Sequence, residues 1–298
     1  MMKLGFLTNR YKKSDVVFAE KIGFDCLEIN ADYTTDLSLD KLSDEDIEQL
    51  VKFFNNHNVS IGTVACSLNL MDGDLEVRNR NIEYMEKMIR KVKQFGTDII
   101  TTNVWGNKSI TPEKNIPLFK EIYSPIAELC EREGVRIGFE NCPHFVGYPL
   151  PIGNIGFSPE MFEALFDAVN SNTLGLEFDP SHLYWLGIDY LTMMRDFSDK
   201  IFAVHAKDTE ILPHYQYKYG IIGKQIGATS EWDAGWWRYR IPGWGEIKWK
   251  EVYKILYDIN YNGPIIIEHE DPVFDGELRP VGLKMGHDYL RQFELPVI

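Results

Sequence analysis

The stretch Ile265-Ile266-Ile267-Glu268-His269-Glu270-Asp271 joins a short apolar run to a cluster of acidic and imidazole side chains. Three consecutive isoleucines are typical of a buried parallel strand. In a barrel of parallel strands, a carboxylate directly after such a run lies at the rim where active sites form. We therefore expect this stretch to carry Glu268 to a functional end of a sheet.

The same pattern occurs three more times upstream, and each time an apolar run ends in an acid or a histidine. The three stretches are Ile137-Gly138-Phe139-Glu140-Asn141, Leu176-Glu177-Phe178-Asp179-Pro180-Ser181-His182 and Phe202-Ala203-Val204-His205-Ala206-Lys207-Asp208. The carboxyl ends of neighbouring parallel strands meet at one edge of a sheet. Four such strands in succession would therefore gather these polar side chains in one place.

Strand-like and helix-like patterns alternate along the chain. The expected strands cover residues 4–9, 26–30, 60–67, 98–105, 135–142, 174–179, 201–208 and 264–271. The expected helices cover residues 14–22, 44–56, 75–95, 117–133, 158–169, 190–197, 248–259 and 281–293. Eight strand–helix units predict an α/β fold, a single-domain (β/α)₈ TIM barrel over residues 1–298. A doubly wound sheet is the rival, but no glycine-rich dinucleotide turn follows the first strand.

Two connections are longer than the others. Residues 141–157 form a loop rich in glycine and proline, and residues 209–246 form a long aromatic-rich insertion after the seventh strand. Long connections after barrel strands belong to the active-site face. We expect the insertion to form a lid or a pocket wall. It holds four of the seven tryptophans, namely Trp232, Trp236, Trp237 and Trp244.

The composition narrows the class of protein. Of the 298 residues, 44% are hydrophobic, which is enough for a sizeable core, and the formal net charge is −14. So acidic a chain is a poor nucleic-acid binder, because phosphate backbones require a basic surface. The chain contains no run of about 18 apolar residues, so no membrane span is predicted. The cysteines form no C-x-x-C pair, so we expect a reduced, cytoplasmic location.

The four strand ends offer Glu140, Asp179, His205 and Glu268. Single acids at strand ends are ordinary polar residues in barrels, but their repetition on consecutive strands favours a metal site. Three carboxylates and one imidazole suit a hard or borderline divalent ion. The sequence therefore predicts one bound divalent ion, with Mn²⁺ preferred and Mg²⁺, Co²⁺ or Zn²⁺ as alternatives.

These motifs resemble those of the xylose isomerase-like TIM barrels, specifically the sugar phosphate isomerase/epimerase group. That group includes ketose 3-epimerases, hydroxypyruvate isomerases, inosose dehydratases and inosose isomerases. The resemblance covers essentially the whole chain and rests on the four strand-end motifs. It implies that Glu140, Asp179, His205 and Glu268 are the metal ligands. It also implies that Glu140 and Glu268 are the catalytic acid/base pair, on opposite faces of the substrate.

A metal that holds a carbonyl and its neighbouring hydroxyl acidifies the C–H bond between them and stabilises the resulting enediolate. Return of the proton to the other face is epimerisation, and its return to the neighbouring carbon is isomerisation. We therefore expect a metal-dependent sugar isomerase or epimerase. Loss of a β-substituent is the alternative, which gives a lyase: a dehydratase or an enzyme that cleaves 3-keto-glycosides or C-glycosides. The ligands alone do not separate these reactions.

Two further candidates lie close to the predicted ligands. The resemblance implies that His182, which follows the sixth strand, binds a substrate hydroxyl, whereas a capping role is the alternative. Lys207 follows His205 by two residues, so it should share that side of the strand. It could neutralise an enediolate oxygen, or it could pair with Asp208 or Glu177.

The remaining candidates for substrate binding lie in loops and at the fourth strand. Arg240 could clamp a carboxylate, a phosphate or a hydroxyl, or remain solvated. Asn103 and Trp105 end the fourth strand, where the indole could stack on a sugar face or pack in the rim. His144 could line the pocket from the loop after the fifth strand. Cys142 beside it is expected to be a small buried filler rather than a thiolate ligand.

Two other functions with a barrel of this kind were weighed. An apurinic endonuclease would need a histidine-rich multinuclear zinc site and a basic DNA-binding surface, whereas this chain has seven histidines and a net charge of −14. A non-catalytic sugar-binding barrel would not need the Glu140 and Glu268 pair. The expected partner is therefore a small sugar or polyol, with no support for a phosphorylated one, and homo-oligomerisation stays open.

Overall fold

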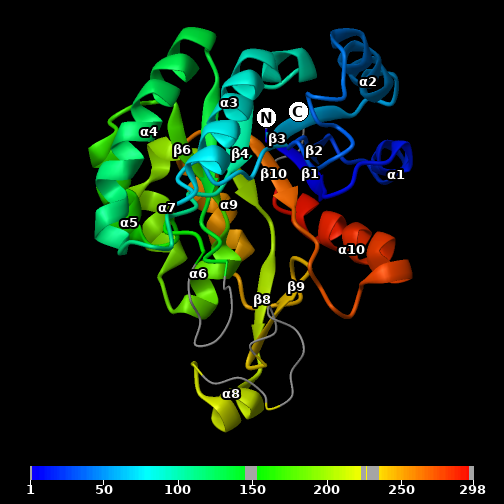
Figure 1. Cartoon of the computed structure of the whole chain (residues 1–298). Coiled ribbons are helices and arrows are strands. Elements are labelled where there is room, and N and C mark those ends of the chain that lie inside the picture. Colours follow the sequence, from blue (N-terminus) through cyan, green and yellow to red (C-terminus); the bar gives the residue numbers. More distant parts are fainter. Residues whose placement is uncertain (1, 145–152, 223–225, 227–234, 295–298) are drawn as a thin grey trace.

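Eight parallel strands close into a barrel, as the sequence predicts (Figure 1). The computed structural model describes residues 2–144, 153–222, 226 and 235–294. The strands follow one another around the barrel in the order β1-β10-β7-β6-β5-β4-β3-β2. They are β1 (Lys3–Thr8), β2 (Cys26–Asn30), β3 (Ser60–Ala65), β4 (Ile99–Thr102), β5 (Arg136–Glu140), β6 (Leu174–Phe178), β7 (Ile201–His205) and β10 (Pro264–Ile267).

Helices surround the barrel, and most match the predicted ranges. Ser158 caps α5 as expected, because its hydroxyl accepts the N–H of Met161. The helices are α1 (Lys13–Ile22), α2 (Asp44–Asn56), α3 (Leu75–Lys91), α4 (Pro112–Glu133), α5 (Pro159–Ala168), α6 (Pro180–Leu186), α7 (Tyr190–Asp196), α9 (Trp249–Asp258) and α10 (Arg279–Arg291). Short 3₁₀ turns cover Val92–Phe95, Ser198–Lys200 and Gly276–Leu278.

Three helices differ from the sequence prediction, and one of them, the unpredicted α8 (Pro213–Tyr219), lies in the insertion described below. α4 begins at Pro112 rather than at residue 117, so Pro117 lies inside the helix instead of opening it. The α6 helix was not predicted at all, because its seven residues are too few for a periodic pattern. Its first residue directly follows Asp179, and it contains His182, which therefore lies on a helix rather than in a turn.

The barrel interior and the layer between strands and helices form the core. Close strand approach requires glycine at Gly175, where a Cβ atom would lie 2.3 Å from the Lys200 carbonyl oxygen of the adjoining chain segment. The interior also encloses charged groups near its carboxyl end, namely Glu28, Glu177 and His205. Among the helices of the described residues, none is long and apolar enough to cross a membrane.

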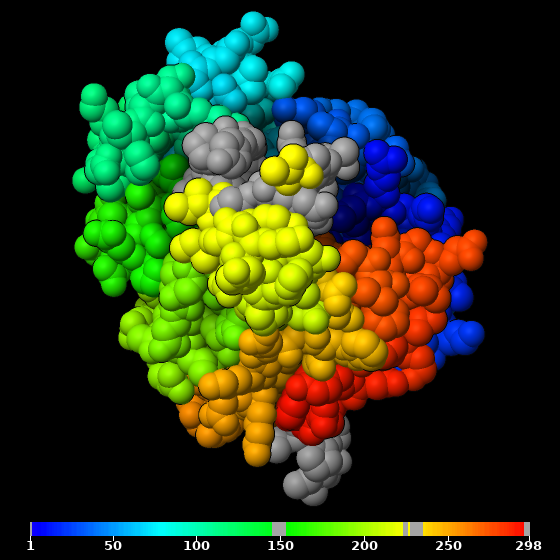
Figure 2. All heavy atoms as spheres, turned by 90° about the horizontal axis from the view of Figure 1, so that it is seen from below, coloured from blue at the N-terminus to red at the C-terminus, as the bar shows by residue number. Residues whose placement is uncertain are grey.

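The insertion after β7 contains a small sheet of its own. β8 (Asp208–Ile211) pairs antiparallel with β9 (Trp237–Arg240), and α8 (Pro213–Tyr219) follows β8. These elements project beyond the barrel at the bottom of Figure 1, and Figure 2 shows α8, in yellow, over the middle of that face. The insertion thus stands over the carboxyl ends of the strands. Trp232 and residues 145–152 of the loop after β5 lie outside the described residues.

Candidate metal centre and its surroundings

The four predicted ligands converge at the carboxyl end of the barrel. Glu140 ends β5, His205 ends β7, and Asp179 and Glu268 directly follow β6 and β10. One potential ligand atom from each lies within 4.8 Å of those of the other three. His205 Nδ1 is 3.2 Å from Glu140 Oε1 and 3.3 Å from Glu268 Oε2. Strands far apart in the sequence thus deliver one compact group of oxygen and nitrogen donors.

Asp179 is fixed by the residue that follows Glu140. The Asn141 side chain accepts the backbone N–H of Asp179 at 2.8 Å and donates to its carbonyl oxygen at 2.7 Å. Asp179 Oδ1 accepts the N–H of Ser181 and caps α6. Its other oxygen, Oδ2, is buried without a hydrogen bond from any described residue. One carboxylate oxygen is therefore used by the fold and the other is left for the site.

Glu140 is held by Asn103, which the sequence placed at the end of the fourth strand. Asn103 Nδ2 donates to Glu140 Oε2 at 3.1 Å, and Asn103 Oδ1 accepts the Ser67 hydroxyl. Burial alone would raise the pKa of Glu140, but hydrogen bonds from His182 and His205 outweigh it and hold this pKa well below its usual range. Glu140 is therefore a carboxylate, ready to bind a cation or to accept a proton.

Lys207 lies on the same side as His205 and is completely enclosed. Its ammonium nitrogen contacts Glu268, and it is 2.9 Å from Glu270 Oε2 and 3.3 Å from Asp179 Oδ2. These partners differ from Asp208 and Glu177, which the sequence suggested. Burial raises the pKa of Glu268, but the Lys207 charge more than offsets it and lowers this pKa to about 2. We call Glu140, Asp179, His205 and Glu268 the four-ligand cluster. Lys207 thus balances part of the negative charge of this cluster.

His182 links the cluster to the aromatic insertion. Its Nε2 is 3.3 Å from Asp179 Oδ2 and 3.1 Å from Lys207 Nζ, and its Nδ1 is 2.7 Å from the Tyr239 hydroxyl. The Lys207 ammonium group also lies 4.3 Å from the Tyr239 ring centroid, within the range of a cation–π contact. Sequence reasoning missed Tyr239 as a site residue. The alternation in β9 gives only a weak signal, because it places Tyr239 on the same face as Trp237.

Beyond Tyr239, three tryptophans form the closed wall of the site. The rings of Trp185 and Trp237 stack with centroids 4.5 Å apart and an interplanar angle of 6°, and Trp236 packs against them. Two tryptophans of the insertion thus pack against Trp185 of α6, and the expected role of the insertion as a lid or pocket wall stays a prediction. We call Trp185, Trp236, Trp237 and Tyr239 the aromatic wall.

Arg240 is engaged by carboxylates within the fold. Its Nε donates to Asp271 at 2.8 Å, and one terminal nitrogen donates to Glu210 at 2.6 Å. The guanidinium also lies 5.3 Å from the Trp244 ring. Arg240 therefore braces the base of the insertion, and its predicted contact with substrate stays a prediction.

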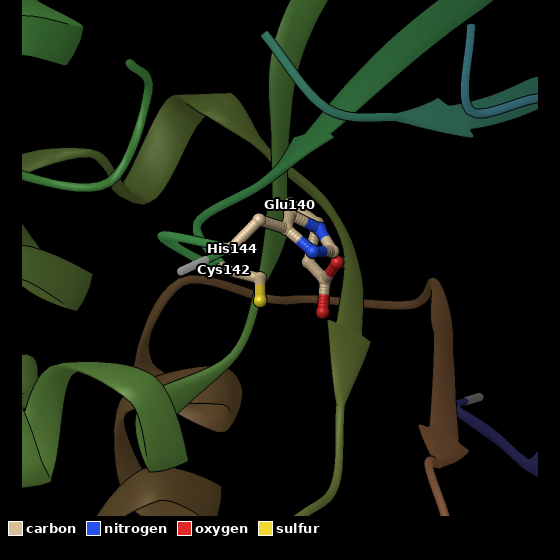
Figure 3. A group of neighbouring side chains, drawn as sticks. All are labelled: Glu140, Cys142 and His144. Atoms are coloured by element: carbon tan, nitrogen blue, oxygen red, sulfur yellow. The ribbon is translucent and has the colours of Figure 1, made fainter. Parts of the chain in front are cut away.

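The loop after β5 contributes a second group beside Glu140. Figure 3 shows Glu140, Cys142 and His144 gathered at the end of β5, with one donor atom of each within 4.8 Å of the others. Burial raises the pKa of the Cys142 thiol well above its usual value, so the sulfur is protonated rather than a thiolate. The His144 ring packs 4.4 Å from Trp105, whose Nε1 donates to Ser67. Trp105 and His144 thus border the cluster on the side of β4.

Two buried carboxyl groups lie on the far side of His205, where the sequence analysis expected none. His205 Nε2 is 3.2 Å from Glu28 Oε2 and 3.1 Å from Glu177 Oε1. Both glutamates interrupt apolar strands at inward-facing positions, in Cys26-Leu27-Glu28-Ile29 and Leu174-Gly175-Leu176-Glu177. A charged residue in the middle of a core strand is the signal that could have identified them.

A cavity of about 460 Å³ opens beside Glu268 at the ends of β1 and β10. Glu268, which also contacts Lys207, forms one side of this cavity. We call it the β1 cavity. It is lined by Leu7, Thr8, Asn9, Arg10, Lys12, Asp15, Glu268, His269 and Arg279.

The donor set of the four-ligand cluster suits a divalent ion. Three carboxylates and one imidazole provide oxygen and nitrogen donors within 4.8 Å of one another, and Asp179 Oδ2 is a buried oxygen without a hydrogen bond in the described part of the chain. Lys207 Nζ and His182 Nε2 each lie 3.3 Å from this oxygen without a hydrogen bond to it, so it can still bind a cation. Glu140, Asp179, His205 and Glu268 therefore could hold a metal ion.

Comparison with known proteins gives the same family from sequence. The family described as the xylose isomerase-like TIM barrel matches residues 16–293. An inosose isomerase of Bacillus velezensis is 25% identical over 276 residues, which are 90% of this chain and 88% of that protein. An inosose dehydratase of Clostridium botulinum is 30% identical over 264 residues, which are 83% of this chain and 81% of that protein.

Solved structures share the fold over nearly the full length. D-psicose 3-epimerase of Clostridium cellulolyticum H10, solved with D-tagatose, has a TM-score of 0.72 at 18% identity and covers 99% of this chain and 100% of its own. The IOLI protein with a bound zinc atom has a TM-score of 0.70 at 21% identity, and the match covers 98% of this chain and 96% of that one. The chain belongs to the xylose isomerase-like TIM barrel family.

Proposed function

We propose that this chain is a divalent-metal-dependent sugar isomerase or epimerase in which Glu140 and Glu268 form the acid/base pair. The observation that carries the proposal is the convergence of Glu140, Asp179, His205 and Glu268, with ligand atoms within 4.8 Å of one another. Such a set of donors at the carboxyl end of a barrel is where the chemistry of this fold takes place. The names of the relatives favour sugars and inososes as substrates.

The cluster would hold one divalent ion, and we propose Mn²⁺ as the preferred one. Oxygen-rich donor sets favour Mn²⁺ or Mg²⁺, while one imidazole and the bound zinc of a relative keep Zn²⁺ and Co²⁺ as alternatives. When bound, the ion would polarise a substrate carbonyl and stabilise the negative charge that develops on its oxygen.

In the proposed reaction, Glu140 and Glu268 act on one carbon from two sides. In the barrel order β10-β7-β6-β5, the strands that carry His205 and Asp179 separate the strands that carry the two glutamates. Both pKa values are lowered, so each group begins as a carboxylate that can accept a proton. One glutamate removes the proton next to the carbonyl. The other takes up a proton from solvent and delivers it to the opposite face, after which the first glutamate releases its proton to solvent.

The surrounding residues have roles in binding and orientation. Asn103 orients the Glu140 carboxylate through its 3.1 Å hydrogen bond. Lys207 and His182 are positioned to contact substrate oxygens at the cluster, with Tyr239 holding the His182 ring. Trp105 and His144 border the place where a sugar ring would lie. Arg240 remains a candidate only through the part of its guanidinium that Asp271 and Glu210 leave free.

A lyase that uses the same first step is the second candidate. The aromatic wall favours it, because Tyr239 connects this apolar cluster to His182 beside the predicted ligands. The similarity to an inosose dehydratase supports elimination as well. In this case the proton is abstracted as before, but a β-substituent leaves in place of a second proton transfer.

Product analysis separates the two candidates. The protein is stripped of metal, reloaded with Mn²⁺, Mg²⁺, Co²⁺ or Zn²⁺ and incubated with ketoses, aldoses, inososes and 3-keto-glycosides. Interconversion of isomers or epimers, without loss of mass, is expected. Stoichiometric release of water or of an aglycone would contradict the isomerase proposal and support the lyase. Absence of any product with a chain that holds one metal ion would contradict both.

A further inference from the structure

The β1 cavity has an unusual charge for so acidic a chain. Three cationic side chains, Arg10, Lys12 and Arg279, line it beside Glu268, while the chain as a whole has a net charge of −14. Asp15 is the other acid in its lining, and it accepts the backbone N–H of Lys12 at 2.8 Å. That carboxylate therefore serves to cap the start of α1.

The three cations form no close ion pair with a described carboxylate, although Asp15 and Asp275 lie near enough to Arg279 to act on its charge. Among the described residues, no carboxylate oxygen lies within 4.0 Å of the charged nitrogens of Arg10, Lys12 or Arg279. Arg279 donates one hydrogen bond to the Leu7 carbonyl oxygen at 3.0 Å, which turns its guanidinium toward the end of β1. Arg240, with two carboxylate partners, shows the opposite arrangement.

The cavity continues past β1 along the rim. A second cavity of about 310 Å³ shares Asn9 and Arg10 with the β1 cavity, and its further lining includes Asn30, Thr34, Thr35 and the acid Asp36. Amide and hydroxyl groups of this kind suit the hydroxyl groups of a sugar. A substrate whose reacting carbon lies at Glu268 can therefore extend into a polar space that begins with three cations.

We propose that the β1 cavity binds an anionic group of the substrate, a carboxylate or a phosphate, so that the substrate is an acidic sugar. This inference rests on the proposed function, because it places the reacting carbon at Glu268. A planar guanidinium binds carboxylate and phosphate oxygens in pairs, and two arginines on different elements would fix both the position and the orientation of the sugar.

The test compares matched ligands by calorimetry, using the Mn²⁺-loaded full chain with Glu140→Gln to prevent turnover. D-Fructuronate and D-fructose differ by a carboxylate in place of a hydroxymethyl group, and fructose 6-phosphate provides the phosphate arm. We expect one of the anionic sugars to bind at least about ten-fold more tightly than fructose. The sugar that binds more tightly shows whether the cavity prefers a carboxylate or a phosphate.

Variants distinguish binding of the anion by the cavity cations from its direct binding to the metal ion. Arg279→Gln and Arg10→Gln should each remove about ten-fold of the preference, whereas Arg195→Gln on the surface of α7 should leave it unchanged. Equal binding of the acid and the neutral sugar, or a preference that survives both cavity variants, would overturn the proposal. If the chain prefers the anionic sugar but the wild-type protein does not convert it, the anion-binding site would be supported and the isomerase proposal would be contradicted.

The second inference comes from an independent observation inside the barrel. His205 has one ring nitrogen toward the four-ligand cluster and the other, Nε2, within 3.2 Å of both Glu28 Oε2 and Glu177 Oε1. All three side chains are buried. Glu28 is in turn held by the Thr101 hydroxyl, which donates to its Oε1 at 2.8 Å.

We infer that Glu28 and Glu177 are positioning residues that keep the proton of His205 on Nε2. Without a metal ion, each ring nitrogen lies 3.2 Å from a carboxylate oxygen, Nδ1 from Glu140 Oε1 and Nε2 from Glu28 Oε2. A metal ion in the cluster would replace the proton on Nδ1, and the proton that remains on Nε2 would then be held by Glu28, with Glu177 Oε1 beside it at 3.1 Å. Partners behind a ligating histidine orient the ring and raise its basicity. This inference concerns the binding of the ion and does not depend on which sugar reacts.

Metal affinity provides the first readout. Glu28→Gln and Glu177→Gln should each weaken Mn²⁺ binding by about 10–100-fold, measured by competition with a chelator. Thr63→Val is the matched control, because Thr63 is buried in β3 beside Glu28 and its hydroxyl has no hydrogen bond in the described structure. Unchanged affinity in both glutamine variants would overturn the inference.

A spectroscopic readout on the wild-type chain does not depend on the stability of variants. ¹⁵N-labelled histidine distinguishes the two tautomers by the chemical shifts of its ring nitrogens. In the Zn²⁺-loaded chain we expect a His205 pattern with the proton on Nε2. A proton on Nδ1 of His205 would contradict the inference.

Discussion

The two flanks of the four-ligand cluster are built in opposite ways. On the side of β7, the aromatic wall packs closely, and Tyr239 reaches His182 at 2.7 Å. On the side of β1, a cavity of about 460 Å³ is lined by three cations that form no close ion pair with a described carboxylate. The barrel supplies the same kind of strand end to both flanks. The difference lies in the loops, since an insertion with its own two-stranded sheet follows β7, whereas residues 9–12 and 268–278, which follow β1 and β10, contain no further strand.

This difference assigns separate tasks to the two flanks. The closed flank fixes the ligands, because Lys207, His182 and Tyr239 contact one another as well as the cluster. The open flank has cationic groups available for a molecule that is not part of the chain. Substitutions on the closed flank should therefore change stability and metal binding, whereas substitutions on the open flank should change ligand binding alone.

The largest effect on stability is expected for Lys207→Met. Removal of this ammonium group leaves Glu268, Glu270 and Asp179 as buried or partly buried negative charges without their cation. The metal-free variant should lose about 3–5 kcal/mol of unfolding free energy, and a bound Mn²⁺ ion should restore part of the loss. Urea denaturation with and without Mn²⁺ measures both. A loss below about 1 kcal/mol, equal to that of exposed Lys254→Met, would contradict the closed-flank assignment.

A pH-dependent effect is expected at His144, on the border of the cluster. Burial lowers the pKa of His144 from 6.5 to about 4, so the folded chain holds a neutral ring where the unfolded chain takes up a proton. Stability should therefore be complete above about pH 6.5 and fall by about 3 kcal/mol as the pH drops to about 4. His144→Gln should flatten this part of the curve in urea titrations. An unchanged slope would show that His144 does not remain neutral.

A smaller effect is expected for Tyr239→Phe in the aromatic wall. The substitution keeps the ring but leaves His182 Nδ1 without its 2.7 Å hydroxyl partner. We expect a loss of about 1–3 kcal/mol in unfolding free energy and weaker substrate binding. The control is Tyr217→Phe, whose ring in α8 is 89% exposed. Equal behaviour of the two variants would mean that the wall does not hold His182.

The smallest effect on stability is expected on the open flank. Arg10→Gln removes a side chain without an acidic partner in the described structure, so unfolding free energy should change by less than about 0.5 kcal/mol. Its effect should appear only in the binding of anionic sugars. A loss above about 1 kcal/mol would show that Arg10 supports the fold instead of a ligand.

The strand-end motifs were sufficient to predict the barrel and to bring Glu140, Asp179, His205 and Glu268 together. The reason is local: a residue at the carboxyl end of a parallel strand has a fixed position at the rim, so its direction follows from the chain alone. Lys207 also lies on the predicted side of its strand. The predicted partners of Lys207, Asp208 and Glu177, were wrong. The observed partners, Asp179, Glu268 and Glu270, follow β6 and β10 and so come from other strands.

The remaining site residues depend on pairing between distant segments. Tyr239 reaches His182 only because β8 and β9 pair, and nothing in either strand alone predicts that register. Asn141 was read as part of a strand motif, but its two hydrogen bonds to Asp179 require the neighbouring strand. The β1 cavity is a space between three elements, and a sequence pattern describes residues rather than the space between them.

The most direct test of the central claim is proton exchange at the carbon next to a carbonyl. The Mn²⁺-loaded chain is incubated in D₂O with ketoses, inososes and acidic ketoses, and deuterium uptake is followed by NMR. We expect metal-dependent uptake that Glu140→Gln and Glu268→Gln each reduce by about 10²-fold or more. No uptake from any of these compounds by a chain that binds one metal ion, or uptake that both variants retain, would contradict the proposed acid/base pair.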